Sequence, residues 1–457
     1  MRSTRRLLDR YPLGAVLLLF ACGAAASCSS ADDERELGPA DAGPEAFAPT
    51  DDAAPSDAGG GDVTAPDAAP APFDGGPLPV VCSSDPCATA LVTTLALDDS
   101  QPSEGYCALL RDGTVACWGA NEVGQLGRGD DAGTSNSAVA GRVVGLSEVE
   151  ELDHTCAVDK SGGIWCWGTG PYLRDGTGAR TTERAPIKLP LAPAKHVGVG
   201  TDVACASNDD GLLCWGKNTN GTFAPLTTMP ADTLVAPRPI DLPSGPPIRE
   251  IRVRQASFVL REDGATLSWG ANPPLGRVSS YTPDPYPLPI PLTGVSSIDL
   301  ASESGCATAG GVGYCWGRLN LRDVSAVTPP VRTLPEPVVA PEPLVQIATT
   351  SLWVDKSLGT PTVRRQRWCA VGASGAVYCW GPNANGQAGD GTKEFAHRAV
   401  KVEGLPKAAA RVKTMPESTC ALLTNGKVYC WGSNYYGQLG NGKPRARTLV
   451  PEEVVLP

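Results

Sequence analysis

The sequence predicts an all-β protein, a seven-bladed β-propeller that follows an export signal and an unfolded tether. Two observations carry this prediction. Six of seven repeat copies hold two cysteines that lie nine or ten residues apart, and a Trp-Gly step recurs at intervals of 47 to 64 residues. A repeat of this length with short strands and turn glycines is typical of propellers and solenoids. The seven Trp-Gly steps begin at Trp118, Trp167, Trp215, Trp269, Trp316, Trp380 and Trp431.

The first element is an export signal. Residues 1–10 carry four arginines, and an apolar run from Leu13 to Ala21 follows them. A positive start followed by a short apolar run is typical of secretory signals, and this run is too short to span a bilayer. We therefore expect the mature chain to leave the cytosol.

The signal ends at a cysteine, and two positions compete to be the lipidation site of a bacterial lipoprotein. Leu19 stands three residues before Cys22, which favours Cys22, whereas small residues precede Cys28. Cleavage before Cys28 removes Cys22 and leaves fourteen other cysteines, an even number that can all pair. Parity therefore favours Cys28, and an ordinary signal peptide with incidental cysteines is the alternative. One acylated cysteine would anchor the chain without a second membrane segment.

Residues 29–80 form the second element, a disordered tether. They hold twelve acidic residues against one arginine, are rich in alanine, proline and glycine, and contain few aliphatic residues. Such a segment cannot build a core, and its like charges and prolines keep it extended. We expect it to space the folded domain, residues 81–457, away from the membrane, with residues 1–28 as the signal and lipidation site.

The third element is a repeated hairpin. Pairing Cys107 with Cys117, which lie ten residues apart, leaves a three-residue loop with Gly113 at its third position. That position turns left-handed in three-residue loops, which suits glycine. Cys306 and Cys315 lie nine apart and leave a two-residue loop, for which a primed turn is expected. The two cysteines then face each other at a non-hydrogen-bonded site with Cα atoms about 4.5 Å apart, within disulfide range.

This register predicts six hairpin disulfides and one further bridge where the tether meets the domain. Phe258 and Ser268 replace both cysteines in the fourth copy, and such joint loss is expected of a bonded pair. Zinc is disfavoured because opposed residues on a hairpin supply two ligands rather than four, so we expect no metal or cofactor. The expected pairs are Cys82–Cys87, Cys107–Cys117, Cys156–Cys166, Cys205–Cys214, Cys306–Cys315, Cys369–Cys379 and Cys420–Cys430.

Further strands flank each hairpin. Strand-like segments at 148–152 and 344–348 precede hairpins, and residues 454–456 follow the last one. Four short strands make a blade, and seven blades around an axis fit a propeller better than an open solenoid. The tryptophan of each Trp-Gly step points away from its neighbouring cysteine, so we expect it to pack between blades rather than to stack on a ligand.

The repeat resembles that of the regulator of chromosome condensation family, which reads Cys-Ala-Leu, a turn glycine, Cys-Trp-Gly and then Asn-x-x-Gly-Gln-Leu-Gly. Residues 121–127 and 434–440 match the last part closely, and residues 383–389 match it except at Ala388. Copies two to five keep the hairpin but lose this turn. The resemblance implies a seven-bladed propeller. It does not carry over nucleotide exchange on a nuclear GTPase, because an exported protein never meets that partner.

Charge and composition favour binding over catalysis. The formal net charge is -11, of which residues 81–457 hold only -3, so a nucleic-acid partner is excluded. The three histidines fall at unrelated repeat positions, and the acidic residues lie mostly in hairpin turns, whereas glycoside hydrolysis needs a positioned carboxylate pair. We expect a non-catalytic scaffold that binds an extracellular protein or polysaccharide. A hydrolase on a propeller scaffold and a purely structural surface protein are the alternatives.

Strand order places the candidate binding residues on one face. The loops between strands one and two of a blade, and between strands three and four, leave on the same side. The long insertion of the sixth copy, residues 351–366, and a proline-rich loop of the fourth copy both lie there, and Tyr, Trp and Arg are enriched at binding hot spots. The candidate partner-binding residues are Trp353, Arg364, Arg365, Arg367, Tyr281 and Tyr286.

The residue that follows the lipidated cysteine bears on the membrane to which a lipoprotein is sorted. Gly23 or Ser29, rather than aspartate, follows the two candidates. In a host with two membranes we therefore expect an outer-membrane lipoprotein that faces the outside or the periplasm. Contact with the membrane is expected through the lipid anchor alone, and the propeller is expected to be a monomer.

Overall fold

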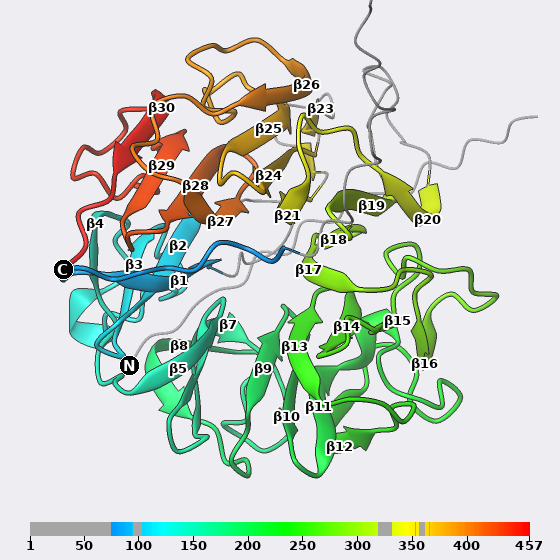
Figure 1. Ribbon diagram of the computed structural model, residues 1–457. Helices are drawn as coiled ribbons and strands as arrows, with labels where there is room; N and C mark the ends of the chain where they lie inside the picture. The colour runs from blue at the N-terminus through cyan, green and yellow to red at the C-terminus, as the bar shows by residue number, and fades with distance from the viewer. Residues whose placement is uncertain (1–74, 95–102, 319–330, 352, 356–361, 365) are drawn as a thin grey trace, which may run out of the picture. The chain divides into compact units, whose positions relative to one another are not determined.

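The computed structural model describes residues 75–94, 103–318, 331–351, 353–355, 362–364 and 366–457. These residues form seven four-stranded antiparallel sheets around a central axis, which is the predicted seven-bladed propeller (Figure 1). The predicted signal, both candidate lipidation cysteines and most of the tether lie outside the described residues.

Each blade is built from one continuous stretch of chain, with its strands in sequence order. Blade 1 contains β1 (Ala88–Thr93), β2 (Gly105–Leu110), β3 (Val115–Gly119) and β4 (Ser137–Arg142). Blade 2 contains β5 (Val149–Asp153), β6 (Cys156–Asp159), β7 (Ile164–Gly170) and β8 (Thr181–Lys188). Blade 3 contains β9 (His196–Val199), β10 (Val203–Asn208), β11 (Gly211–Lys217) and β12 (Leu234–Ile240). Blade 4 contains β13 (Ile248–Val253), β14 (Ala256–Arg261), β15 (Thr266–Gly270) and β16 (Asp284–Pro289).

The remaining three blades follow the same plan. Blade 5 contains β17 (Val295–Leu300), β18 (Ser304–Ala309), β19 (Val312–Arg318) and β20 (Val331–Pro337). Blade 6 contains β21 (Leu344–Thr349), β24 (Trp368–Gly372), β25 (Val377–Gly381) and β26 (Ala396–Lys401), with a small extra hairpin of β22 (Trp353–Asp355) and β23 (Thr362–Arg364). Blade 7 contains β27 (Ala409–Thr414), β28 (Ser418–Leu423), β29 (Val428–Gly432) and β30 (Thr448–Glu453). Two short 3-10 helices, η1 (Asp130–Ala132) and η2 (Asn218–Asn220), lie in loops.

The first strand of each blade lies nearest the axis. First strands of neighbouring blades contact one another all the way round, and β27 of blade 7 meets β1 of blade 1, so the ring is closed. Residues 454–456, predicted to form a strand, lie beyond β30 in irregular structure. That prediction was wrong because the chain leaves β29 after Val454, whose amide still binds the carbonyl of Val428 at 2.9 Å, and the amide of Val455 binds the carbonyl of Gly440 instead.

The hairpin register is the predicted one. Each of the six cysteine pairs is directly opposed, with Cα atoms 4.1 to 4.2 Å apart, and all seven expected disulfides are formed. Gly113 has φ of 75° and its counterpart Gly426 has φ of 80°, as a left-handed loop position requires. In blade 4, Phe258 faces Ser268 in the place of the disulfide and is fully buried against Trp316 of blade 5.

The tryptophans pack between blades, as predicted. Trp118 donates its indole N–H to the carbonyl of Gln438 in blade 7 at 3.0 Å, and Trp431 donates to the carbonyl of Gln387 in blade 6 at 2.9 Å. Trp167, Trp215 and Trp316 make the equivalent bond to the blade before them. The acceptors in blades 1, 6 and 7 belong to the Asn-x-x-Gly-Gln turn, whereas those in blades 2 and 4 are the carbonyls of Pro171 and Pro274.

The apolar core is divided among the blade interfaces. Seven clusters of buried side chains lie in the described part of the chain, one between each pair of neighbouring blades, including the pair formed by the last and first blades. Burial between blades therefore holds each sheet against two neighbours. The ring is rigid where the blades touch, and its two faces and its axis are left to the loops.

Candidate binding surface around the central cavity

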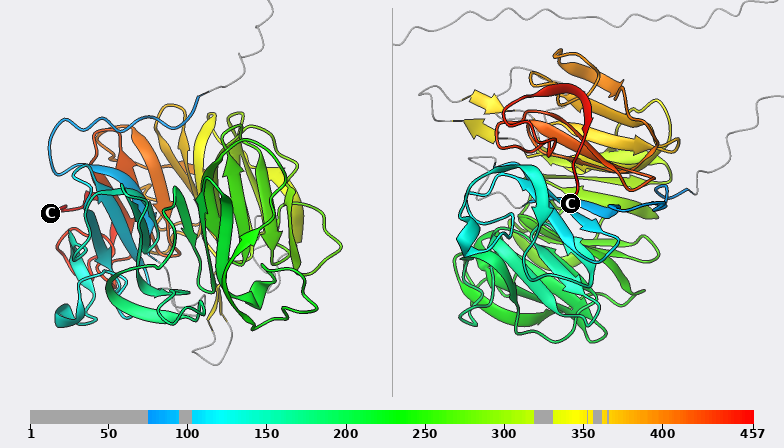
Figure 2. Two further views of the ribbon diagram at one scale, coloured as in Figure 1. Left: turned by 90° about the horizontal axis from the view of Figure 1, so that it is seen from below. Right: turned by 90° about the vertical axis from the view of Figure 1, so that its left-hand side faces the viewer.

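The predicted binding residues do not form one patch. Trp353 and Arg364 are opposite each other in the strand register of the extra hairpin β22–β23. This hairpin extends beyond the face of the ring (Figure 2). Arg365 lies outside the described residues. Tyr281 and Tyr286 are 56% and 48% exposed and form an edge-to-face pair with ring centroids 6.0 Å apart. They belong to blade 4, which is not a neighbour of blade 6, so these two tyrosines stand apart from the hairpin.

Arg367 is not a surface residue. Its side chain is only 1% exposed and lies between blades 6 and 7, where it donates hydrogen bonds to the carbonyls of Met415 at 2.8 Å and Ser418 at 3.0 Å and to the hydroxyl of Thr419 at 2.6 Å. Desolvation lowers the pKa of this guanidinium to about 10. The prediction that Arg367 contacts a partner is therefore corrected: the residue joins two blades.

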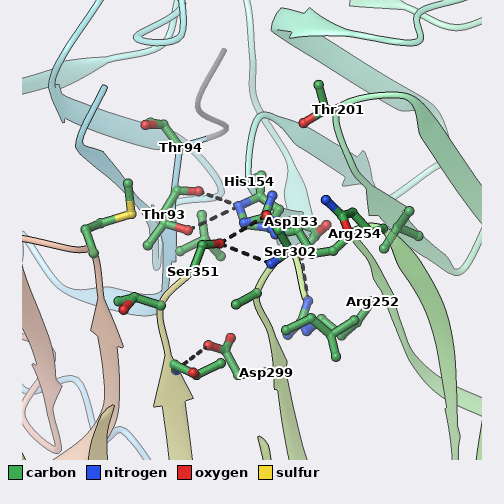
Figure 3. Close-up of a pocket in the computed structure, with 18 of the residues that line it drawn as sticks. Thr93, Thr94, Asp153, His154, Thr201, Arg252, Arg254, Asp299, Ser302 and Ser351 are labelled. Carbon is green, nitrogen blue, oxygen red and sulfur yellow. Dashed lines mark hydrogen bonds and ion pairs between the residues drawn. The ribbon is translucent and has the colours of Figure 1, made fainter. Parts of the chain in front are cut away.

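A cavity of about 350 Å³ lies on the axis of the ring (Figure 3). Its lining comes from the ends of the innermost strands and from the loops that follow them in all seven blades. These are loops between strands one and two or between strands three and four. The cavity is therefore on the side of the ring that carries the β22–β23 hairpin, and we call this side the cavity face.

Seven equivalent residues of the innermost strands surround the axis, and five of them line the floor of the cavity. Each stands on the innermost strand opposite the first cysteine of its hairpin, or opposite Phe258 in blade 4. Four carry charge and three are small or apolar. In order from blade 1 to blade 7 they are Val92, Asp153, Gly198, Arg252, Asp299, Ala348 and Lys413.

The four charged residues form two ion pairs. Each pair joins two blades that are not neighbours, and the blade between them has a small residue at the equivalent position. Arg252 of blade 4 reaches Asp153 of blade 2 at 2.7 Å, past Gly198 of blade 3. Lys413 of blade 7 reaches Asp299 of blade 5 at 2.7 Å, past Ala348 of blade 6. A larger side chain on blade 3 would clash, because a Cβ atom at its glycine would come within 2.7 Å of an isoleucine of blade 4.

Each aspartate also binds the backbone of the blade that its ion pair skips. Asp153 accepts from the amide of Val199 at 3.0 Å, and Asp299 accepts from the amide of Thr349 at 2.9 Å. Both carboxylates are thus held by a cation and by a backbone donor. A carboxylate whose oxygens are occupied by a cation and a backbone amide is poorly placed to reach a substrate as a general acid or base.

His154 lies beside this floor, in the two-residue turn between β5 and β6. Its φ of 48° is in the left-handed region that non-glycine residues seldom occupy. Its Nδ1 lies 2.8 Å from the carbonyl oxygen of Thr93, which can only accept, so Nδ1 carries the proton. Burial and the nearby charges of Arg254, Lys413 and Arg252 hold its pKa well below the usual value. The ring is therefore neutral, and its Nε2 is an acceptor.

The sequence interpretation missed both the charged floor and His154. Because the three histidines occupy unrelated repeat positions, the repeat pattern predicts no site for any of them. A usable signal was present: Arg252, Asp299 and Lys413 lie six or seven residues before Phe258, Cys306 and Cys420, within strands that are otherwise largely apolar. Which charges meet across the axis depends on blades being skipped, and no single repeat shows that.

The chain joins the propeller on the side opposite the cavity face. The amide of Val81 donates to the carbonyl of Thr424 at 2.7 Å, and the amide of Ala88 donates to the carbonyl of Gly426 at 2.8 Å. Arg111 binds Asp85 at 2.6 Å. These contacts tie the leading segment to the hairpin turns between strands two and three of blades 7 and 1. Such turns leave a blade on the side away from the cavity.

No group of three or more His, Cys, Asp or Glu side chains within the described ranges could hold a metal ion. None of the described helices has the length and apolar character that crossing a bilayer requires. The seven disulfides fit an oxidising compartment outside the cytosol.

Comparison with known families identifies the repeat. The family model of the regulator of chromosome condensation (RCC1) repeat matches residues 103–125 and 417–438, which lie in the first and last blades. The Arabidopsis thaliana ultraviolet-B receptor UVR8 is 26% identical over 346 residues, which cover 73% of this chain and 64% of the receptor. The human E3 ubiquitin-protein ligase HERC2 is 25% identical over 363 residues, but the match covers only 7% of that protein.

Solved structures show the same fold. Prp20p of Saccharomyces cerevisiae, studied for its binding to Gsp1p and histones, superposes with a TM-score of 0.59 at 19% identity, covering 76% of this chain and 87% of the yeast chain. Human WBSCR16 gives a TM-score of 0.55 at 18% identity over 76% of this chain and 95% of its own. The chain is thus a seven-bladed propeller that is similar in fold to these structures and carries the RCC1 repeat in its first and last blades.

Proposed function

We propose that this propeller of RCC1-type repeats is a non-catalytic binding scaffold of the cell envelope. It is exported, is anchored by a lipid on Cys28 or Cys22, and binds an extracellular protein or polysaccharide on its cavity face. The observation that carries the proposal is geometric. The ring presents a projecting hairpin and an axial cavity on one side, and the chain leads in from the other.

The rigidity of the ring supports binding rather than chemistry. Blades buried against both neighbours hold their loops in fixed positions, so a partner would order little of the surface when it binds. The acidic residues at the cavity floor are occupied by ion pairs and backbone amides. The relatives with described roles include a receptor and a protein studied for its binding of Gsp1p and histones.

The point at which the chain joins the ring leaves the cavity face accessible. Val81 and Ala88 are bound to hairpin turns on the side opposite that face. A partner that binds on the cavity face would therefore not compete with the segment that leads into the ring.

Lipid attachment is tested directly by labelling. A host grown with radioactive palmitate should incorporate label into the wild-type chain and into one of the two single variants, Cys22→Ser or Cys28→Ser. The double variant should carry none, because no acyl acceptor of the signal remains. Label that persists in the double variant contradicts the lipoprotein assignment, and unlabelled wild-type chain does so as well.

The hairpin is tested by replacing residues 353–364 with a short Gly-Ser linker. Ser351 and Gln366 stay, because the first binds Ser302 at 3.1 Å and the second binds Ser304 at 2.9 Å and the carbonyl of Arg318 at 2.7 Å. We expect an unchanged melting temperature and at least tenfold weaker retention of partners from the host's envelope and secreted fractions, which equals about 1.4 kcal/mol.

The matched control for this replacement is Asp209→Asn. Asp209 is exposed in a hairpin turn on the opposite side of blade 3, so its change should leave partner retention intact. Equal loss in both variants would show that retention is non-specific. Full retention by the shortened protein would move the binding surface away from the hairpin.

A further inference from the structure

The cavity has a composition that the binding role alone does not explain. Most of the residues that line it have polar side chains: hydroxyls from several blades, amides of Asn220 and Gln255, and four cationic side chains against three carboxylates. We propose that it receives one carboxylate side chain of a protein partner. This inference rests on the proposed binding function and assigns a chemical class to what enters the centre of the surface.

Charged side chains lie across the axis at the floor of the cavity. The ion pairs Arg252–Asp153 and Lys413–Asp299 cross the axis at its floor, and both are largely shielded from solvent. Ser302 and Ser351 bind each other at 3.1 Å on the wall between blades 5 and 6 (Figure 3). A side chain that enters from the cavity face therefore meets polar groups around it and a charged floor beneath it.

Some polar atoms of the lining residues have no hydrogen-bond partner among the described residues. They are Thr94 Oγ1, Arg252 Nε and Thr349 Oγ1. The guanidinium nitrogen can only donate, and each hydroxyl can donate as well as accept. The carboxylates of Asp153 and Asp299 are already engaged. A ligand that brings acceptor oxygens therefore suits this lining better than one that brings only donors, and hydrogen bonds to a charged acceptor are the stronger kind.

The charges point the same way. Burial first, and then the charges of Arg254, Lys413 and Arg252, hold the pKa of His154 well below its usual value. Arg252 is paired with Asp153 and Glu250, and Lys413 with Asp299. Counting Asp202 with the two paired aspartates, the lining still holds four cationic side chains against three carboxylates, in a protein whose formal net charge is -11. An anion is favoured there, and its arrival would favour the protonated imidazole.

A protein side chain fits the lining better than an acidic sugar does. Pockets that retain small molecules by themselves usually have aromatic side chains in their lining, and among the described residues the imidazole of His154 is the one aromatic ring that lines this cavity. A glutamate or aspartate would instead be held by its charge while the rest of the partner covers the cavity face and the hairpin. The scaffold's use in protein binding by Prp20p is consistent with that partner class.

His154 itself reports on the site. The chain has only three histidines, so the imidazole NMR signals can be assigned with His154→Gln, His196→Gln and His397→Gln variants. The full chain in detergent is titrated from acid to neutral pH with the capped peptide Gly-Ser-Glu-Ser-Gly, its Gln counterpart, or galacturonate, each up to about 50 mM, well above a millimolar Kd. Circular dichroism checks that each variant is folded.

We expect the Glu peptide to raise the pKa of His154 by about one unit, because an opposite charge comes close to the ring. The Gln peptide should not do so, and His196 and His397 should not respond. In Arg254→Gln the response should fall at least tenfold in apparent affinity. An equal response to both peptides, a response to galacturonate alone, or no response overturns the assignment. If the hairpin replacement still abolishes partner retention, the binding function stands and only the carboxylate assignment fails.

Discussion

Replacing Asp299 with alanine should destabilise the ring by about 3 kcal/mol, the largest effect expected of any single substitution considered for this protein. The change leaves the ammonium of Lys413 without its partner and removes the acceptor for the amide of Thr349. Both groups are largely buried, and a buried charge without compensation is costly. The free energy of unfolding is measured by urea titration with circular dichroism as the readout.

Two controls separate the buried pair from ordinary surface charge. The double variant Asp299→Ala with Lys413→Met removes both charges and should recover most of the lost stability, because replacing a buried pair by apolar groups is often neutral. Asp209→Ala breaks an exposed pair with Lys195 and should cost less than about 1 kcal/mol. If Asp299→Ala lowers the free energy of unfolding no more than Asp209→Ala does, the ion pairs across the axis do not stabilise the ring.

Replacing Glu104 with glutamine should remove a pH dependence from the stability of the ring. Glu104 is 1% exposed and joins the first blade to the last, accepting from the amide of Glu417 at 2.6 Å, from Ser418 Oγ at 2.5 Å and from Gln438 Nε2 at 3.3 Å. Tyr106 binds the same serine at 3.0 Å. No blade borrows a strand from another, so these side chains help to close the ring.

The direction of the pH effect follows from the pKa. Burial first, and then the charge of Glu417, raise the pKa of Glu104 from 4.5 to about 7. The folded state therefore favours the protonated carboxyl more than the unfolded chain does. The stabilisation is fully present below pH 4.5 and is lost as the pH rises through 7, over which it amounts to about 3 kcal/mol.

Glu104→Gln should therefore be more stable than the wild type at pH 8, by about 2 kcal/mol, and nearly equal to it at pH 5. Thermal unfolding of both proteins between pH 5 and 8 gives the comparison. Glu122→Gln, an exposed neighbour in the same blade, is the matched control and should leave the pH profile unchanged. A Glu104→Gln profile parallel to that of the wild type would contradict a raised pKa at the closure.

The repeat units were predictable because their signals are local. Cysteines nine or ten residues apart define the hairpin, its loop glycine and its disulfide, and the tryptophan beside the second cysteine must leave on the opposite side of the strand. Each of these depends on spacing within about ten residues, and the structure confirms them. Where two cysteines are replaced, as by Phe258 and Ser268, the register is kept and the phenylalanine packs between blades.

The site was harder to predict because it is made by the ring rather than by any repeat. Arg367 looks like a loop arginine in the sequence, yet carbonyls from the next blade, such as that of Met415, surround it. His154 has no counterpart in other copies, and only ring closure brings it beside Lys413 and Arg252. Such contacts join blades far apart along the chain, where spacing carries no information.

The central claim is that a partner binds on the cavity face, and hydrogen exchange of the full chain bound to a partner captured from the host's envelope tests it most directly. We predict that binding slows amide exchange in the β22–β23 hairpin and in the loops that line the cavity, around 200–202, 253–255 and 301–303. The turns between strands two and three, such as 111–113 and 425–426, should exchange as in the free protein. Slowed exchange confined to those turns would place the partner on the opposite side of the ring and contradict the account.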